Sequence, residues 1–147
     1  MNPRPQMRQQ YHIRHDAEGS RIWDVHGLVR LARDLPVQRA LLSDIRELDE
    51  PYWFDAHHPT TREIIDHMRL VQQTDLAYPI ILCPDGRVMD GMHRVCKAVL
   101  EGGTDIAAVR LPTMPEPDYR NVSLDSLPYD DGDGDDDDDD DDGTVAP

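Results

Sequence analysis

The segment from residue 79 to residue 103 places the strongest constraint on what this 147-residue chain can fold into. Its apolar run 79–83 (PIILC) is short and is followed by Pro-Asp-Gly at 84–86, which is a strong turn signal. Residues 87–89 then return as the second strand of a hairpin. Apolar side chains recur at helical spacing over 92–99, until the glycine pair 102–103. The segment therefore predicts a β-hairpin that leads directly into an amphipathic helix.

Upstream, the sequence predicts one further helix and one strand. Asp24 is a good N-cap, and apolar residues at i, i+3, i+4 and i+7 follow it between positions 25 and 32. Pro36 ends this helix. Residues 37–42 are typical of a short strand, and residues 43–45 indicate a turn or one helical turn.

A second helix is expected to begin near Thr60, after a loop over residues 47–59. Thr60 and Glu63 have the capping-box spacing, in which each side chain satisfies a free backbone amide. Its predicted apolar stripe consists of Ile64, Ile65, Met68 and Val71. A last strand is expected over 106–111. The order helix, strand, helix, hairpin, helix, strand predicts an α+β fold with a small mixed sheet and packed helices.

Composition divides the chain into three predicted parts. Residues 1–20 are polar without an apolar period and are interpreted as a mobile N-terminal arm, followed by the domain over 21–120. Residues 121–147 form an acidic tail expected to be disordered, because like charges repel and nothing apolar offsets the ordering entropy. Eleven aspartates within 130–142 account for most of the net charge of −15. The remaining chain has a mixed surface charge, which does not favour nucleic acid as a partner.

Several classes of protein are set aside by the sequence. The longest apolar runs have four or five residues, so no membrane-spanning helix is expected, and the N-terminus lacks the apolar core of a secretory signal. Cys83 and Cys96 make no disulfide framework, which favours a cytoplasmic location. Cys96 lies on the apolar face of its helix and is interpreted as a core residue.

The junction between the hairpin and its helix is the candidate site. In Asp90-Gly91-Met92-His93-Arg94, glycine stands between the strand and the first helical turn, where backbone amides are unpaired and the helix dipole is positive. Arg94 and His93 add side-chain donors suited to phosphate. The sequence predicts an anion site here. The alternative is that Asp90 caps the helix, Gly91 makes the turn and Arg94 is merely solvated.

This segment resembles the core of the ParB/sulfiredoxin superfamily, in which a hairpin leads to a G-x-x-R or D-G-x-H-R junction and a helix with a small residue, here Ala98. The resemblance extends upstream through LPVQRALLSDI and TREIIDHMRLVQQ and covers about residues 35–111. It implies that Asp90, Gly91, Met92, His93 and Arg94 hold the phosphates of a nucleotide such as ATP, ADP or CTP. Mg²⁺ prefers phosphate oxygens together with one or two carboxylates, so Asp90 or a loop acid could serve an ion that accompanies the nucleotide.

The resemblance leaves the reaction open. Sulfiredoxins carry a catalytic cysteine where this chain has Met92, and no helix-turn-helix follows the core as it does in chromosome-partitioning ParB proteins. The free serine kinases share the D-G-x-H-R junction and use a loop carboxylate as base. Glu47, Asp49 and Glu50 occupy the comparable loop, and Glu47 or Glu50 is the expected base. The expected activity is hydrolysis or transfer of a nucleotide phosphate.

Other interpretations remain open at this point. The domain is alternatively a non-catalytic module that binds a nucleotide or a protein, or a ParB-like nuclease or DNA-associated protein. His57, His58 and His67, with Asp55 and Asp66, match no compact zinc pattern, so no metal site is predicted there. Residues 52–54 (Tyr-Trp-Phe) are expected to pack under the site loop, with stacking on a base as the alternative. The oligomeric state is not predicted.

Overall fold

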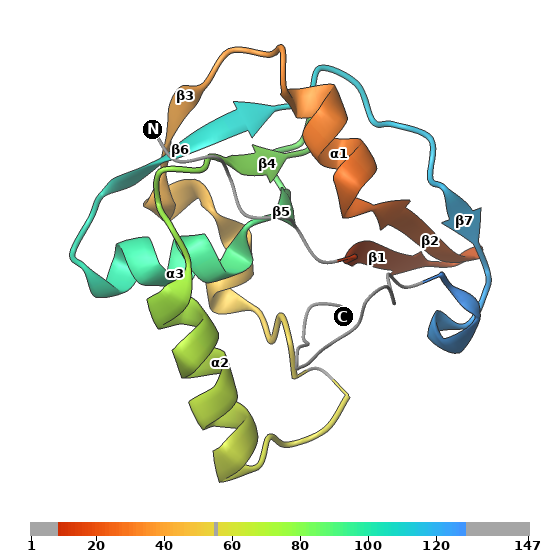
Figure 1. Ribbon diagram of the computed structural model, residues 1–147, viewed down its shortest axis with the longest axis horizontal. Helices are drawn as coiled ribbons and strands as arrows, with labels where there is room; N and C mark the ends of the chain where they lie inside the picture. The colour runs from red at the N-terminus through yellow and green to blue at the C-terminus, as the bar shows by residue number, and fades with distance from the viewer. Residues whose placement is uncertain (1–8, 55, 129–147) are drawn as a thin grey trace.

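The computed structural model describes residues 9–54 and 56–128, which form an α+β fold with three α-helices and two β-sheets (Figure 1). The elements are β1 (Tyr11–Asp16), β2 (Gly19–Asp24), α1 (Val25–Ala32), β3 (Gln38–Leu41), α2 (Thr61–Gln73), β4 (Ile80–Leu82), β5 (Val88–Asp90), α3 (Met92–Leu100), β6 (Asp105–Arg110) and β7 (Tyr119–Arg120). Three 3₁₀ helices complete them: η1 (Leu42–Asp44), η2 (Arg46–Asp49) and η3 (Leu124–Ser126). Within this part of the chain, no helix is long and apolar enough to cross a membrane.

The predicted mixed sheet is confirmed as a four-stranded sheet in the order β3-β6-β4-β5. Strands β4 and β6 are parallel, whereas β3 pairs with β6 and β5 with β4 in antiparallel register. The hairpin turn closes where the Cys83 amide donates to the Arg87 carbonyl at 2.8 Å. Gly86, at φ +86°, supplies the left-handed residue that this turn requires. The hairpin leads into α3 as the sequence predicted.

Alternating side chains of this sheet build a core on each of its faces. On one face Ile80, Leu82 and Val88 pack against Met92 and Val95 of α3. On the other face Ile81, Met89 and Val109 pack against Leu28 of α1 and against Trp23. This arrangement follows from the period of two along a strand, and it places α1 and α3 on opposite faces of the sheet (Figure 1).

The expectation of an N-terminal arm over residues 1–20 is wrong from residue 11 onward. Tyr11–Asp16 pairs in antiparallel register with Gly19–Asp24, and β7 completes a second, three-stranded sheet in the order β1-β2-β7. The folded region therefore begins before residue 21 and extends beyond residue 120. Residues 1–8 of the predicted arm and residues 129–147 of the predicted tail lie outside the described residues.

Contacts distant in sequence explain why this sheet has no clear signal in the N-terminal segment. Tyr11 and Ile22 share a small core with Leu127, which lies more than 100 residues away in the chain. Trp23, 1% exposed, joins the core of the other sheet, and its indole nitrogen donates to the Pro115 carbonyl at 2.9 Å. The segment 11–24 becomes a hairpin because residues 115–127 return to cover it.

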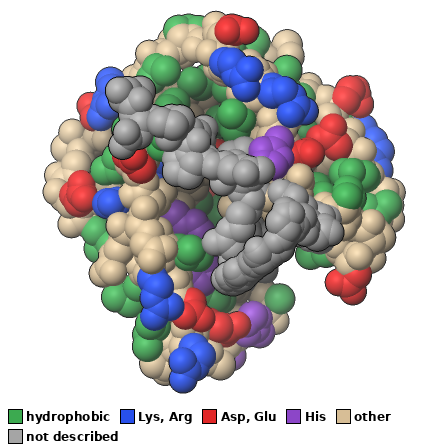
Figure 2. Space-filling model, viewed as in Figure 1, with side chains coloured by type: hydrophobic (Ala, Val, Ile, Leu, Met, Phe, Trp, Pro, Cys, Tyr) green, Lys and Arg blue, Asp and Glu red, His purple; other side chains and the backbone are tan. Residues whose placement is uncertain are grey.

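Helix α2 has the predicted start but buries a different face. The Thr60–Glu63 capping box is confirmed, with the Glu63 amide donating to Thr60 Oγ1 at 3.1 Å and the Thr60 amide donating to Glu63 Oε1 at 2.8 Å. Of the predicted apolar stripe, only Val71 is buried. Ile64, Ile65 and Met68 are about half exposed, at 45%, 47% and 54%. In the part of the molecule that contains α2, positively and negatively charged side chains share the surface with exposed hydrophobic ones (Figure 2).

Candidate functional site

The junction between β5 and α3 is shaped by Gly91, which has a left-handed backbone with φ +106°. A Cβ atom at this position would lie 2.6 Å from Ile80 Cγ2, so the chain accepts only glycine here without strain. Gly91 is itself the N-cap of α3 and supplies no side-chain cap. Asp90, the alternative cap considered from the sequence, ends β5 instead.

The first turn of α3 leaves two backbone amides unpaired. The Arg94 and Val95 amides both donate to the Gly91 carbonyl, at 2.9 and 3.1 Å. The amides of Met92 and His93 have no hydrogen-bond acceptor among residues 9–54 and 56–128. Unpaired amides at the positive end of a helix dipole are suited to binding an anion.

Arg94 is buried beneath the junction rather than extended into solvent. It is 9% exposed, and its Nη2 donates to Asp90 Oδ2 at 3.1 Å and to the Pro79 carbonyl at 3.4 Å. Its Nε is buried and has no partner in the described residues. In this conformation Arg94 fixes Asp90 and the glycine turn, so the predicted direct contact of Arg94 with phosphate requires its side chain to leave Asp90.

His93 lies in a cluster of aromatic rings contributed by three elements. The ring of Trp53 stacks on it with centroids 4.5 Å apart, and His67 Nδ1 of α2 lies 3.3 Å from His93 Nε2. Burial, with the neighbouring His67 and Arg94, lowers the pKa of His93 to about 4. At neutral pH His93 is therefore an uncharged donor or acceptor and does not add a positive charge to the site.

Glu47 is the carboxylate that the fold brings to the start of β5, the strand that leads to the junction. It is 5% exposed, and its Oε2 accepts a hydrogen bond from the Val88 amide at 2.9 Å. Its Oε1 is buried without a partner in the described part of the chain. Val88 begins the strand that Asp90 ends, about 7 Å away along the strand. The buried Oε1 of Glu47 is an acceptor that could take a hydrogen bond or a proton from a group that reaches it.

Glu50, the other expected base, is occupied by an ion pair. Its Oε1 accepts a hydrogen bond from Arg87 Nη1 at 2.8 Å, and this bond holds the pKa of the exposed carboxyl below its usual value. Arg87 also lies 3.6 Å from Glu47 Oε2. The structure thus separates the two candidates: Glu47 is buried with a free oxygen, and Glu50 is exposed and paired.

Three further residues lie in this region and are not among the predicted catalytic or phosphate-binding residues: Tyr52, Trp53 and His67. Tyr52 is half buried, and burial together with the charges of Glu47 and Asp90 raises the pKa of its hydroxyl. Trp53 packs at the junction, as expected of the 52–54 segment, and its ring stacks on that of His93, one of the predicted site residues. His67 interrupts the apolar stripe of α2 between Ile64 and Val71, and this polar residue at a core spacing is the signal that could have indicated it.

The histidine, acidic and cysteine residues outside the junction do not form a second site within the described part of the chain. Among the described residues, no group of three or more His, Cys, Asp or Glu side chains is arranged to hold a metal ion. His57 lies 3.2 Å from the Glu63 carboxylate, at the start of α2. Cys96 is partly buried against the core of the mixed sheet, and burial raises the pKa of its thiol.

Comparison with known proteins gives no match: no family model, no curated protein and no solved structure is similar to this chain.

Proposed function

We propose that the β5–α3 junction binds the phosphate groups of a nucleotide and supports hydrolysis or transfer of a phosphate. The observation that carries the proposal is that two features lie at opposite ends of the short strand β5. The unpaired amides of Met92 and His93 lie at the positive end of α3, and the buried Glu47 has a partner-free carboxylate oxygen beside the adjoining strand. The first feature suits an anion, and the second suits removal of a proton.

Each residue of the junction has a defined role in this proposal. Gly91 allows phosphate oxygens to approach the backbone, and the Met92 and His93 amides donate to them. Arg94 acts as a positioning residue that holds Asp90 and the turn. Glu47 removes the proton from water or from a hydroxyl acceptor, whose oxygen then attacks phosphorus while the bond to the leaving phosphate breaks.

Magnesium fits the residues that are present. Mg²⁺ prefers phosphate oxygens together with one or two carboxylates. Asp90 offers Oδ1, because the described contacts of its carboxylate use Oδ2 only. Asp90 would hold the ion, which would neutralise charge on the phosphates. The chain's own amides still provide the contacts that fix the phosphate position.

A calorimetric titration of the full chain with ATP, ADP, CTP and GTP, with and without magnesium, tests the binding site. Gly91→Ala is expected to weaken binding at least tenfold, since it displaces the backbone that carries both free amides. Saturable binding by the wild type that Gly91→Ala retains at full strength would contradict the site. Failure of all four nucleotides to bind would remove the nucleotide from the proposal.

The base is tested by comparing two carboxylates in one assay. Glu47→Gln is expected to retain nucleotide binding and lose at least 100-fold in phosphate release or transfer, as is usual for removing a general base. Glu50→Gln is the matched control and should lose little, because its carboxylate is engaged by Arg87. Equal losses in both variants would refute the role of Glu47.

The structure also favours one alternative, in which the nucleotide is bound and not turned over. The rings of Trp53 and His67 pack on His93, so its imidazole is engaged within the protein and is not free to transfer a proton. Single-turnover product analysis distinguishes the two functions. Nucleotide recovered unchanged from a saturated complex would identify a binding module, and released phosphate would identify an enzyme.

A further inference from the structure

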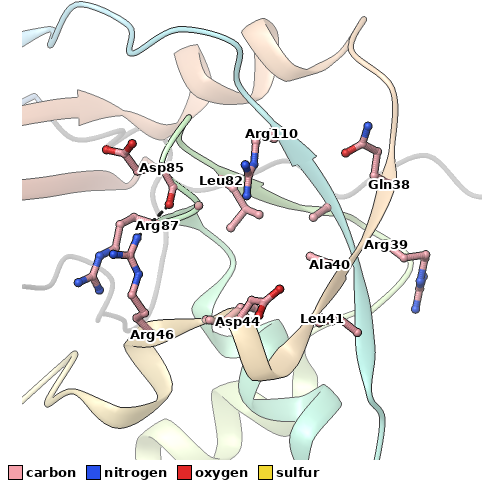
Figure 3. Close-up of a pocket in the computed structure, with 13 residues that line it drawn as sticks. Gln38, Arg39, Ala40, Leu41, Asp44, Arg46, Leu82, Asp85, Arg87 and Arg110 are labelled. Atoms are coloured by element: carbon pink, nitrogen blue, oxygen red, sulfur yellow. Dashed lines mark hydrogen bonds between the residues drawn. The ribbon is translucent and has the colours of Figure 1, made fainter.

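A hollow of about 830 Å³ lies beside the mixed sheet (Figure 3). Its walls come from β3, β4 and β6, from the turn between β4 and β5, and from η1 and η2. It includes the carboxyl ends of the parallel pair β4 and β6, where Leu82 lies opposite Arg110. Crevices at the carboxyl ends of parallel strands are common places for ligands to bind.

Four arginines from four different segments line this arginine hollow: Arg39, Arg46, Arg87 and Arg110. Their chain positions are far apart, so the fold gathers them. Arg46 Nη2 donates to the Asp85 carbonyl at 2.9 Å, which anchors one edge of its guanidinium. Arg39 is paired with Asp105 at 2.7 Å and is directed outward in the close-up (Figure 3).

Arg110 is the arginine whose charge is most available. Within the described part of the chain it has no ion-pair or hydrogen-bond partner, and its guanidinium lies beside Leu82 at the centre of the close-up (Figure 3). A Cβ atom at Gly86 would lie 3.1 Å from Arg110 Nη2, so glycine gives the guanidinium its room. A hollow that is lined by an unpaired arginine and by a second, anchored one presents donors for an oxyanion.

The acidic residues of the hollow restrict the kind of anion. Asp44 and Asp85 also line it, and Arg87 shares its charge with Glu50 and Glu47. A large polyanion would meet like charge at these carboxylates. A small molecule with one oxyanionic group meets the guanidinium groups, and its hydroxyl or amino groups find acceptors at the aspartates.

We propose that the arginine hollow is a second binding site, which takes the phosphate or carboxylate group of a small polar molecule between Arg46 and Arg110. This inference goes beyond the proposed function, because the described residues that line the hollow include none of the junction residues 90–94. Arg87 connects the hollow with the proposed base, since it lines the hollow and lies 3.6 Å from Glu47 Oε2.

Residue-resolved NMR titration of the full chain tests the proposal with two probes, inorganic phosphate and acetate. We expect saturable shifts of the Nε–Hε signals of Arg46 and Arg110 and of the Gly86 amide. The probe that saturates at the lower concentration identifies phosphate or carboxylate as the preferred group. Absence of saturable shifts at these positions with both probes would overturn the proposal.

Arginine substitutions test whether the NMR shifts arise from binding in the hollow. Arg110→Gln is expected to weaken binding of the preferred probe about fivefold, the size typical of one partly exposed charged contact. Arg62→Gln, which removes an exposed arginine of α2, is the control for general loss of charge and should leave affinity unchanged. Equal weakening in both variants would overturn the site. If Arg110→Gln does not give a folded spectrum, Arg46→Gln provides the same comparison.

The same spectra distinguish binding in the arginine hollow from binding at the β5–α3 junction. Phosphate bound at the start of α3 would shift the Met92 and His93 amides, and Arg110→Gln should leave those shifts unchanged. Shifts at the junction without shifts at Gly86 and Arg110 would refute the arginine hollow and leave the proposed function standing. The reverse result would support the hollow and contradict the junction.

Discussion

Two carboxylates three residues apart acquire different chemistry from their surroundings. Glu47 is fixed by the Val88 amide inside the protein, and Glu50 is held by Arg87 at the surface. Buried polar groups without partners cost free energy, so the partner-free Oε1 of Glu47 is kept at the expense of stability. Such groups are often found where a ligand completes the hydrogen bonding.

His93 gives the stability of the protein a defined pH dependence. Its pKa is lowered to about 4 in the folded state, whereas an unfolded histidine titrates near 6.5. The unfolded state therefore binds more protons between these values, so stability is complete above about pH 6.5 and falls as the pH decreases toward 4. We expect a loss of the order of 1–2 kcal/mol from His93 between pH 7.5 and 5.

Urea unfolding at pH 7.5 and 5 measures this effect. His93→Phe keeps a ring for stacking on Trp53 and should reduce the pH-dependent loss, while the lowered pKa values of His12 and His67 maintain the rest. His58→Phe, at an exposed histidine, is the control. An identical loss in wild type and His93→Phe would show that His93 does not titrate as described.

Two glycines with left-handed backbones are expected to differ in their response to alanine. Gly91→Ala places Cβ against Ile80 and should cost about 2–3 kcal/mol. Gly102→Ala meets no atom within 4 Å, so only the backbone strain remains, about 1 kcal/mol. Chemical denaturation measures both free energies of unfolding. Equal losses of unfolding free energy in the two variants would mean that Ile80 moves away from the new Cβ atom without destabilising the protein.

Helix α2 shows what local signals predict and what they leave out. Its start was predicted because the capping box involves only residues 60–63, and such contacts depend on the chain nearby. Which face is buried depends on the partner: His67 contacts His93 of α3, and Val71 is the one buried residue of the predicted apolar stripe. The same reason explains Arg94: its pairing with Asp90 is local in sequence, but its burial depends on β4.

Substitutions on α2 test this orientation. Met68→Lys should change the free energy of unfolding by less than about 0.5 kcal/mol, because the side chain is 54% exposed. Val71→Ala should cost about 2 kcal/mol, since Val71 is 6% exposed and its loss leaves a cavity. Thermal or urea unfolding of the two variants gives the comparison. A large loss for Met68→Lys would place the apolar stripe in the core, as the periodicity alone predicted.

At the scale of the whole molecule, the sequence predicted one of the two sheets. The mixed sheet is encoded in contiguous apolar runs and a Pro-Asp-Gly turn, and those signals were sufficient. The sheet β1-β2-β7 was missed because its strands are polar on one face and its core residues come from both ends of the described chain. Trp23 connects the two sheets through the core that it shares with α1.

This connection predicts that the two sheets unfold together. The chain has two tryptophans, Trp23 in β2 and Trp53 beside the junction. Trp53→Phe leaves Trp23 as the fluorescent probe of the first region, and Trp23→Phe leaves Trp53 as the probe of the second. Within each variant, the fluorescence midpoint in urea should coincide with the midpoint from circular dichroism. Separate midpoints would show two independently folding units.

The hydrogen bond from the Tyr11 hydroxyl to the Pro128 carbonyl has a topological consequence. Because Tyr11 and Pro128 are in contact, a bridge of about four to six residues between them would close the chain from residue 11 to residue 128 into a ring. The exposed turn at Gly102-Gly103 would then provide new ends, and the order of the elements along the chain would change while their packing stayed the same. A circularly permuted chain of this design would carry its first and last residues between α3 and β6.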